Sequence, residues 1–202
     1  MRIPRAEGHR EAERLEAFSD GVMAVIITIM ALGLDVPKDT TWHAVADELP
    51  SLLVYVLSFT MIGIYWNNHH QLLRATERIS GAVMWANLHL LFWLSLIPVT
   101  TKWVGQEYRA HLPACVYGIV LLASAVAYGI LVQTIIRTNG RDSAVANAIG
   151  SDLKGNLSIG LYVCAIGLAW VSPWISYAIF LAVAVVWFVP DRRFSPSGSG
   201  EE

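Results

Sequence analysis

Six long apolar stretches, each close to the ~20 residues that a helix needs to cross a bilayer, dominate this 202-residue sequence. Hydrophobic residues make up 55% of the chain and charged residues only 15%, and the charges gather between the stretches. A water-soluble domain needs far more polar surface than this composition supplies. The sequence therefore predicts an all-α integral membrane protein with six transmembrane helices. The expected spans are about 15–34, 46–73, 80–104, 112–137, 153–171 and 173–189.

The positions of Lys and Arg predict the orientation of these spans. If the N-terminus lies in the cytoplasm, eleven of the fourteen basic residues fall on cytoplasmic segments, and only Lys38, Lys102 and Arg109 fall outside. Such an excess is the positive-inside bias of membrane proteins. We therefore expect both termini to be cytoplasmic. The expected regions are a cytoplasmic N-terminal segment over 1–14, a six-helix transmembrane domain over 15–190 and a flexible cytoplasmic tail over 191–202.

Charge and cysteine usage exclude several other classes of protein. The net charge of -2 is too small to indicate a nucleic-acid partner. Cys115 and Cys164 lie inside apolar stretches, so we expect free thiols rather than a disulfide or a metal pair. The first span has no second copy later in the chain, which indicates a single structural unit. Any chemistry must lie within or between the helices.

The first apolar stretch is short for a helix that faces lipid. Only fourteen uncharged residues separate Asp20 from Asp35, which is about 21 Å of helix against a hydrocarbon core of ~30 Å. A carboxylate near the membrane centre costs roughly 2.5–3.5 kcal/mol. We therefore expect this helix to lie inside the bundle or beside water. A second interpretation is that Ser19 and Asp20 cap the helix at the cytoplasmic interface.

Polar residues recur at a similar depth in the next two spans. The second span ends in Trp-Asn-Asn-His-His over 66–70, and the third carries Asn87 and His89. Polar groups inside a bundle satisfy one another across helices. We therefore expect one interhelical network with Asp20 and Arg14 at its edge.

The histidines also raise the question of a metal site. His69 and His70 are adjacent, so they point about 100° apart on a helix and do not both face one ion. No Cys, Asp or Glu accompanies them or His89 in a zinc-type spacing. We therefore expect no structural metal and no cofactor. A proton-titrating role for one histidine stays open, because this side chain titrates near neutral pH.

The motif Arg14-x-x-x-Phe18-Ser19-Asp20 at the head of the first span resembles the signature of the endosomal–lysosomal potassium channel family, the transmembrane protein 175 type. The residues 66–70, and the stretch from Phe92-Trp93 to Gly105, extend the resemblance over the first half of the chain. Prokaryotic members of this family carry one six-helix unit and assemble as homotetramers around a central pore. The resemblance therefore implies a multi-pass protein in the inner (plasma) membrane of a prokaryote, with the lipid bilayer and further copies of itself as partners.

In that family the first helix lines the pore. The resemblance places the constriction at Val25, five residues after the signature Asp20, where the family usually has Ile or Leu. It places a hydroxyl residue at Thr28, and Leu32 lies one turn further outward. Together with Ile29 these residues share one helix face, which without the resemblance would be an ordinary packing stripe. The residues expected to hold the helix against its neighbours are Arg14, Phe18, Ser19, Asp20, Trp66, His69, His70, Asn87, His89 and Trp93.

The implied function is a potassium-selective channel rather than an enzyme. No Thr-Val-Gly-Tyr-Gly segment occurs, so the carbonyl filter of other potassium channels is absent. We expect Val25 side chains to form an apolar neck that gates by dewetting. Thr28 hydroxyls beyond it would bind K⁺ transiently, with modest preference over other monovalent cations.

Three alternatives belong to other classes of protein. A proton-coupled secondary transporter would use the inner-leaflet His and Asp residues as its relay. An intramembrane enzyme could be built on His69, His70, His89 and Asp20, but no nucleophile–base motif or metal signature is present. A non-catalytic scaffold would use the polar network for packing alone.

Overall fold

The computed structural model describes residues 5–140, 142–143, 145–146 and 153–188, and every regular element among them is helical. The predicted tail over 191–202 lies outside the described residues. The helices are α1 (Arg5–Leu32), α2 (Trp42–Asp47), α3 (Leu49–Arg74), α4 (Gly81–Ser95), α5 (Ile97–Gln106), α6 (His111–Asn139), α8 (Leu153–Leu168) and α9 (Pro173–Phe188).

Four helical runs of the described chain are long and apolar enough to cross a membrane. They cover 10–32, 49–74, 81–106 and 111–139. The helices α8 and α9 are also apolar but shorter, at 16 residues each. The prediction of a multi-pass, all-helical membrane protein is confirmed, and the first four expected spans correspond to the four long runs.

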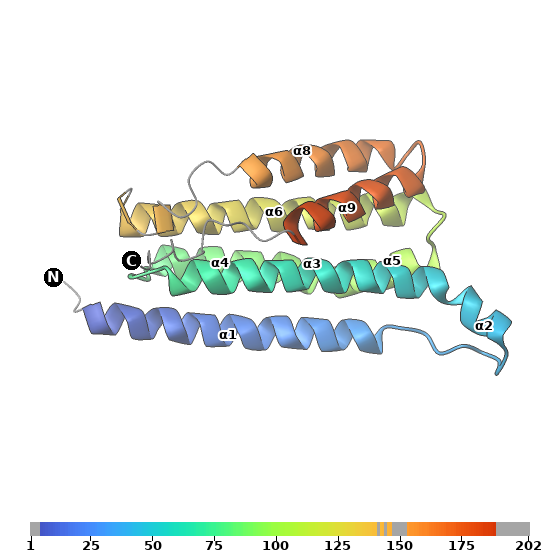
Figure 1. The fold of residues 1–202 in the computed structure, drawn as a ribbon, viewed down its shortest axis with the longest axis horizontal. Helices are drawn as coiled ribbons and strands as arrows, with labels where there is room; N and C mark the ends of the chain where they lie inside the picture. Colours follow the sequence, from blue (N-terminus) through green and yellow to red (C-terminus); the bar gives the residue numbers. More distant parts are fainter. Residues whose placement is uncertain (1–4, 141, 144, 147–152, 189–202) are drawn as a thin grey trace, which may run out of the picture.

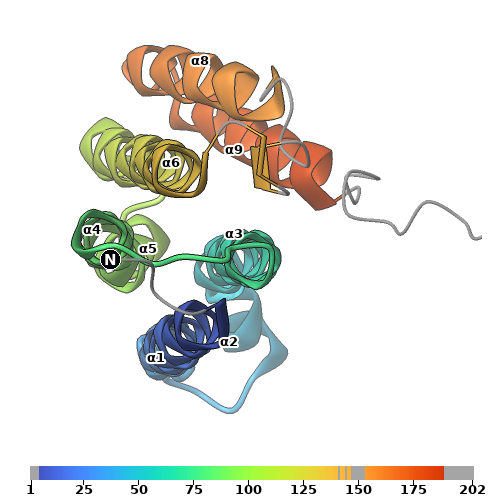
Figure 2. The ribbon, with the colours of Figure 1, turned by 90° about the vertical axis from the view of Figure 1, so that its left-hand side faces the viewer.

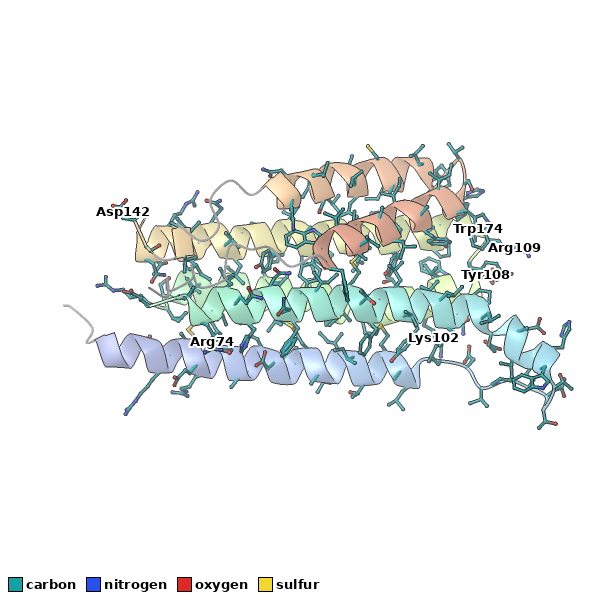
Figure 3. The ribbon with its side chains drawn as sticks, in the orientation of Figure 1. Arg74, Lys102, Tyr108, Arg109, Asp142 and Trp174 are labelled. Atoms are coloured by element: carbon teal, nitrogen blue, oxygen red, sulfur yellow. The ribbon has the colours of Figure 1, made fainter. Side chains whose placement is uncertain are left out.

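The helices run side by side in successive layers, with α1 along one edge and α8 and α9 along the other (Figures 1 and 2). Helix α1 packs against α3, α4 and α5, whereas α6 packs against α4, α5, α8 and α9. Charged residues lie near the two ends of the bundle: Arg74 and Asp142 lie toward the end at which α1 begins, and Lys102 and Arg109 lie toward the other (Figure 3). The expectation that the first helix lies inside the bundle is wrong for a single chain, because α1 is a peripheral helix.

Helix α1 starts ten residues earlier than the predicted span. It begins at Arg5 and continues without a break to Leu32, so residues 5–14 of the expected N-terminal segment are part of the same helix. Ser19 and Asp20 therefore lie in the middle of a 28-residue helix. The interpretation of these two residues as a helix cap is wrong, because the backbone N–H groups near them already have partners within the helix.

The third expected span is divided into α4 and α5 at Leu96. Pro98 follows two residues later, in the first turn of α5, where its missing N–H group and fixed φ angle are tolerated. Leu96 keeps right-handed helical angles (φ -86°, ψ -14°), so the two helices continue as one apolar run. The short helix α2 was not predicted, although Thr41 caps it by accepting a hydrogen bond from the Ala44 N–H group at 3.2 Å.

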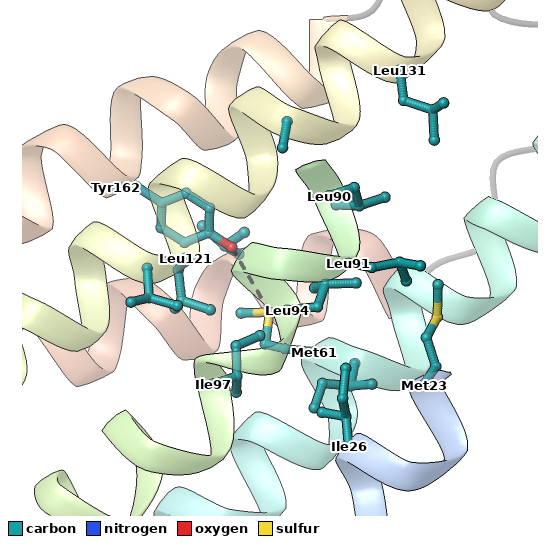
Figure 4. Close-up of a cluster of buried hydrophobic side chains, with 14 of the residues drawn as sticks. Met23, Ile26, Met61, Leu90, Leu91, Leu94, Ile97, Leu121, Leu131 and Tyr162 are labelled. Carbon is teal, nitrogen blue, oxygen red and sulfur yellow. Dashed lines mark hydrogen bonds between the residues drawn. The ribbon is translucent and has the colours of Figure 1, made fainter. Parts of the chain in front are cut away.

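The core between the layers is made of tightly packed aliphatic and sulfur-containing side chains. Met23 and Ile26 of α1 meet Met61 of α3 and Leu94 of α4 there (Figure 4). Tyr162 of α8 reaches the same cluster and donates a hydrogen bond to the Met61 sulfur at 3.8 Å. One continuous core therefore joins the outer helices to α1.

A buried hydroxyl cluster joins three helices within this core. Thr101 of α5 donates to Ser58 of α3 at 2.7 Å, and the Ser58 hydroxyl bonds the Tyr117 hydroxyl of α6 at 2.9 Å. Inside a bilayer such bonds replace water as the partner of each polar group. They fix α3, α5 and α6 relative to one another, which provides the rigid side against which α1 packs.

At Gly118 helix α6 lies close against side chains of α8 and α9. A Cβ atom added there would lie 2.9 Å from both Ile166 and Phe180, whereas one added at Gly129 of the same helix would meet nothing within 4 Å. Gly118→Ala is expected to lower the free energy of unfolding by about 1–3 kcal/mol through overpacking. Gly129→Ala, the control, is expected to leave it unchanged or raise it slightly, because Ala favours helix. Thermal unfolding in detergent measures both, and equal stability of the two variants would contradict the packing.

Candidate functional site

One face of α1 is buried against the bundle and the opposite face is left uncovered by it. The buried side chains recur every three or four residues, as expected for an amphipathic helix against a core; they are Ala12, Leu15, Ser19, Met23, Ile26 and Met30. On the other face the side chains of Val25 and Ile29 are each 53% exposed, and Leu32 is 84% exposed. All four residues predicted for the pore, including exposed Thr28, lie on the uncovered face.

The same uncovered face carries a row of small residues. Ala17, Gly21, Ala24, Thr28 and Ala31 are all exposed and follow one another at spacings of three or four. A Cβ atom added at Gly21 would meet nothing within 4 Å, so no other part of the described chain approaches the helix there. Rows of small residues let membrane helices come close together.

Thr28 presents an oxygen atom on this face. Its hydroxyl donates a hydrogen bond to the Val25 carbonyl of the same helix at 2.9 Å. The hydroxyl proton is therefore engaged by the backbone, and the lone pairs of the oxygen are available to accept a hydrogen bond or to coordinate a cation.

A directional hydrogen-bond chain ties α1 to α4 and α3. The Ser19 hydroxyl donates to the Leu15 carbonyl at 2.8 Å, so it can only accept from the Asn87 side-chain amide, 2.9 Å away. That orientation turns the Asn87 oxygen toward the His69 Nε2 atom at 2.7 Å. His69 must then carry its proton on Nε2 and donate. Ser19, His69 and Asn87 are each fully buried, and their bonds fix the rotation of α1 against its neighbours.

A second polar group lies beside this chain, between α1 and α3. The Trp66 indole N–H donates to the Asp20 carboxylate at 3.0 Å, and the Trp66 ring stacks on His70 at 5.9 Å between centroids. The His70 Nδ1 atom lies 2.6 Å from the Glu16 carboxylate. Asp20 therefore meets a donor from the neighbouring helix instead of lipid, which removes much of the cost of placing a carboxylate here.

The predicted single network is divided into separate groups. His89 and Trp93 form a pair of their own on the outer side of α4, where the Trp93 indole N–H donates to His89 Nε2 at 2.9 Å. Phe18 is 53% exposed and points away from the buried stripe of α1. Arg14 is exposed beside Ser80 and Met84 at the head of α4, where these residues line a shallow groove.

Sequence reasoning missed the partners of two carboxylates, Glu16 on α1 and Asp35 just after it. Glu16 was overlooked because it lies outside the signature and some fifty residues from His70, its partner in space. Asp35 accepts a hydrogen bond from Gln106 at 3.1 Å and lies 4.0 Å from the Lys102 ammonium group. Neither pairing could be predicted from local sequence spacing. The first joins α1 to α3, and the second joins the segment after α1 to α5.

No metal-ligating spacing surrounds His69 and His70 in the sequence, but the fold brings one histidine together with two carboxylates of another helix. His69 and His70 do point apart, His69 to Asn87 and His70 to Glu16. However, ligand atoms of Glu16, Asp20 and His70 all lie within 4.8 Å of one another. Within the part of the chain that the structure describes, these three residues are therefore the ones that could hold a metal ion.

Fold and site together define an all-helical, multi-pass membrane protein whose first helix is tied to the bundle by one face and uncovered on the other. Residues 14–98 match the family described as Endosomal/lysosomal potassium channel TMEM175. A protein of Chryseobacterium sp. (strain P1-3) named as a potassium channel is 47% identical over 184 residues, which cover 91% of this chain and 96% of that relative. The chain therefore belongs to the TMEM175 family, which is a family of ion channels and not of enzymes.

Two further relatives show how far the similarity extends. The crystal structure of a lysosomal potassium-selective channel TMEM175 homolog from Chamaesiphon minutus has a TM-score of 0.80 and 27% identity, and the match covers 92% of this chain and 100% of that one. A bovine protein named as the endosomal/lysosomal proton channel TMEM175 is 27% identical over 206 residues, covering 86% of this chain but only 41% of its own length.

Asn87 is the central link of the buried chain, and its loss tests the arrangement. Asn87→Leu is expected to lower the free energy of unfolding by about 1–3 kcal/mol, because Ser19 and His69 each lose a buried partner. Asn67→Leu is the matched control, since Asn67 is exposed on α3. Unfolding in mixed detergent micelles measures the difference. A control that is destabilised as much as Asn87→Leu would contradict a specific role for the chain.

Proposed function

We propose that this protein is a potassium channel in the inner (plasma) membrane of a prokaryote, formed by four copies arranged around the uncovered faces of α1. Each chain would cross the membrane six times, with both termini in the cytoplasm. The proposal rests on one observation above the others: no described part of its own chain covers the face of α1 that carries Val25, Thr28 and Leu32. The family and the potassium channels named among its bacterial members support it.

The surface of α1 favours assembly with further copies over contact with lipid alone. Lipid exposure gives no reason for small residues, whereas a second helix needs them to approach closely. The uncovered face of α1 has Ala17, Gly21 and Ala24 in a row beside the larger Phe18 and Val25. Small and large residues in adjacent rows are suited to interdigitate with the same rows of a neighbouring α1.

The proposed conduction path has two parts. A ring of Val25 side chains would form an apolar neck, which excludes water when narrow and therefore closes the path to ions. The Thr28 oxygens lie one turn further along and would replace part of the hydration shell of a passing K⁺. Because the Thr28 proton is donated to the Val25 carbonyl, the oxygen can turn its lone pairs toward the ion. So few ligands would give a modest preference for K⁺.

The assembly makes a prediction at Gly21. Gly21→Leu is expected to convert the tetramer into smaller species, because a large side chain would separate the small rows of neighbouring α1 helices. Gly160→Leu is the control: Gly160 is exposed on α8, along the opposite edge of the bundle, and a Cβ atom added there also meets nothing within 4 Å. Multi-angle light scattering of the detergent complex gives the mass. A wild-type mass of one chain, or a tetramer unaffected by Gly21→Leu, would overturn the arrangement.

Ion selectivity makes a second prediction. Thr28→Val keeps the shape of the side chain but removes its oxygen, so the K⁺ to Na⁺ permeability ratio is expected to fall severalfold while current persists. Thr134→Val is matched to it, because the Thr134 hydroxyl likewise donates to its own helix, at 2.7 Å to the Ile130 carbonyl on α6. Reversal potentials across a planar bilayer, with K⁺ on one side and Na⁺ on the other, measure the ratio.

The same recordings distinguish the proposal from its alternatives. A coupled carrier would show flux that saturates and depends on a second substrate, and a proton pathway would follow the pH gradient instead of the K⁺ gradient. Either outcome, or an unchanged permeability ratio in Thr28→Val, would contradict the proposed path. Because the bovine relative is named as a proton channel, the recordings include a pH gradient as well as a K⁺ gradient.

A further inference from the structure

Three side chains of metal-ligating type from two helices meet next to the signature motif. Glu16 and Asp20 stand on successive turns of α1, and His70 stands near the end of α3. Their ligand atoms lie within 4.8 Å of one another, and no other three His, Cys, Asp or Glu side chains of the described residues converge in this way. The side chain of Glu16 is only 16% exposed and that of His70 32% exposed, so the group is not an ordinary cluster of surface charges.

The His70 Nδ1 atom has no hydrogen-bond partner among the described residues. The His70 Nδ1 atom is shielded from solvent and lies 2.6 Å from a Glu16 carboxylate oxygen, yet it makes no hydrogen bond of acceptable direction. A hydrogen bond requires the N–H group to point along the line between the two atoms. A metal ion bound by both atoms at ~2.0–2.2 Å would hold them roughly 3.0–3.5 Å apart, so the two side chains would separate by about 0.5–1 Å to admit it.

The charge of the group also favours a cation. A metal-bound imidazole is neutral, so in that state the two carboxylates give the group two negative charges, and partial burial makes such charge costly unless it is compensated. The Trp66 indole bonds one oxygen of Asp20 but supplies no net charge. A divalent ion would cancel the charge and use the remaining lone pairs of all three side chains.

We propose that Glu16, Asp20 and His70 form a binding site for a divalent transition-metal ion, for which Zn²⁺ is the probe. One imidazole nitrogen and two carboxylate oxygens are ligands that Zn²⁺ accepts in tetrahedral geometry, with water in the fourth position. Trp66 supplies the outer shell, since it holds Asp20 by a hydrogen bond at 3.0 Å and stacks on His70.

The site would tie α1 to α3 at the level of the signature. Its ligands come from both helices, so a bound ion adds a link between them that the protein side chains alone do not make. Asp20 lies five residues before Val25 on the same helix. Metal binding therefore stiffens the attachment of the helix that carries the proposed neck. Binding itself requires only the fold of one chain and does not depend on whether the assembly conducts ions.

The test is titration calorimetry of tag-free, full-length protein in detergent with ZnCl₂, after treatment with a chelator. Wild type is expected to bind one Zn²⁺ per chain. Glu16→Gln, which keeps the shape of the side chain, and His70→Ala are each expected to weaken binding by at least ~10-fold, because even the loss of an outer-shell partner costs ~10–100-fold. Trp66→Phe is expected to weaken it by about 10-fold through that outer shell.

His43→Ala is the matched control, because His43 and Asp47 form an exposed histidine–carboxylate pair on α2 with 3.2 Å between their atoms. It is expected to bind Zn²⁺ as wild type does. Melting curves with chelator present establish that each variant is folded, and addition of Zn²⁺ is expected to raise the melting temperature of wild type but not of Glu16→Gln. The absence of saturable binding to wild type, wild-type affinity in Glu16→Gln, or loss of binding in His43→Ala would each overturn the proposal.

Discussion

A polar side chain in the middle of a membrane bundle needs a hydrogen-bond partner from the protein, and the bonds that reach a neighbouring helix organise the first half of this chain. Within lipid there is no water to take the place of a missing partner, and apolar side chains gain little by leaving lipid for protein. Packing alone would leave α1 free to rotate about its axis at small cost. The bonds from Ser19 to Asn87 and from Asn87 to His69 remove that freedom, because only one rotation of α1 satisfies them.

The fixed rotation of α1 determines which of its side chains face away from the bundle. With Ser19 turned toward α4, residues seven and eleven positions away on the helix, Ile26 and Met30, also face the bundle and are buried. Val25, Ile29 and Leu32 then point away from it. The signature motif therefore does not itself contribute the residues proposed to meet the ion. It sets the rotation of α1, and that rotation decides which face of the helix is left uncovered. The hydroxyl cluster of Ser58, Thr101 and Tyr117 supports this arrangement by holding the helices behind α1 in place.

Much of the fold was predictable because the thickness of the bilayer sets the length of each apolar stretch, and charged residues mark where the stretches end. The four long runs lie where the apolar stretches predicted them, and Pro98 marks the division of the third. The start of α1 was not predictable in this way, since residues 5–14 are polar and hydropathy cannot separate a polar helix from a polar loop. Helix-face periodicity placed Val25, Thr28, Ile29 and Leu32 together. It could not decide which face is covered, because that depends on the partners of Ser19 on distant helices. The meeting of Glu16 with His70 was invisible for the same reason.

The chain from His69 to Ser19 has a consequence for the movement of protons. A proton wire needs members that both receive and release protons in sequence. Here the Ser19 hydroxyl donates its hydrogen bond to the Leu15 carbonyl, which has no proton to pass on. The Asn87 side chain between Ser19 and His69 is an amide, which does not take up a proton on one side and release another on the other side. A proton that reached His69 would therefore have no onward route through this chain. Ser19, Asn87 and His69, each fully buried, therefore hold α1 in place without relaying protons, and the proposed ion path lies on the other side of that helix.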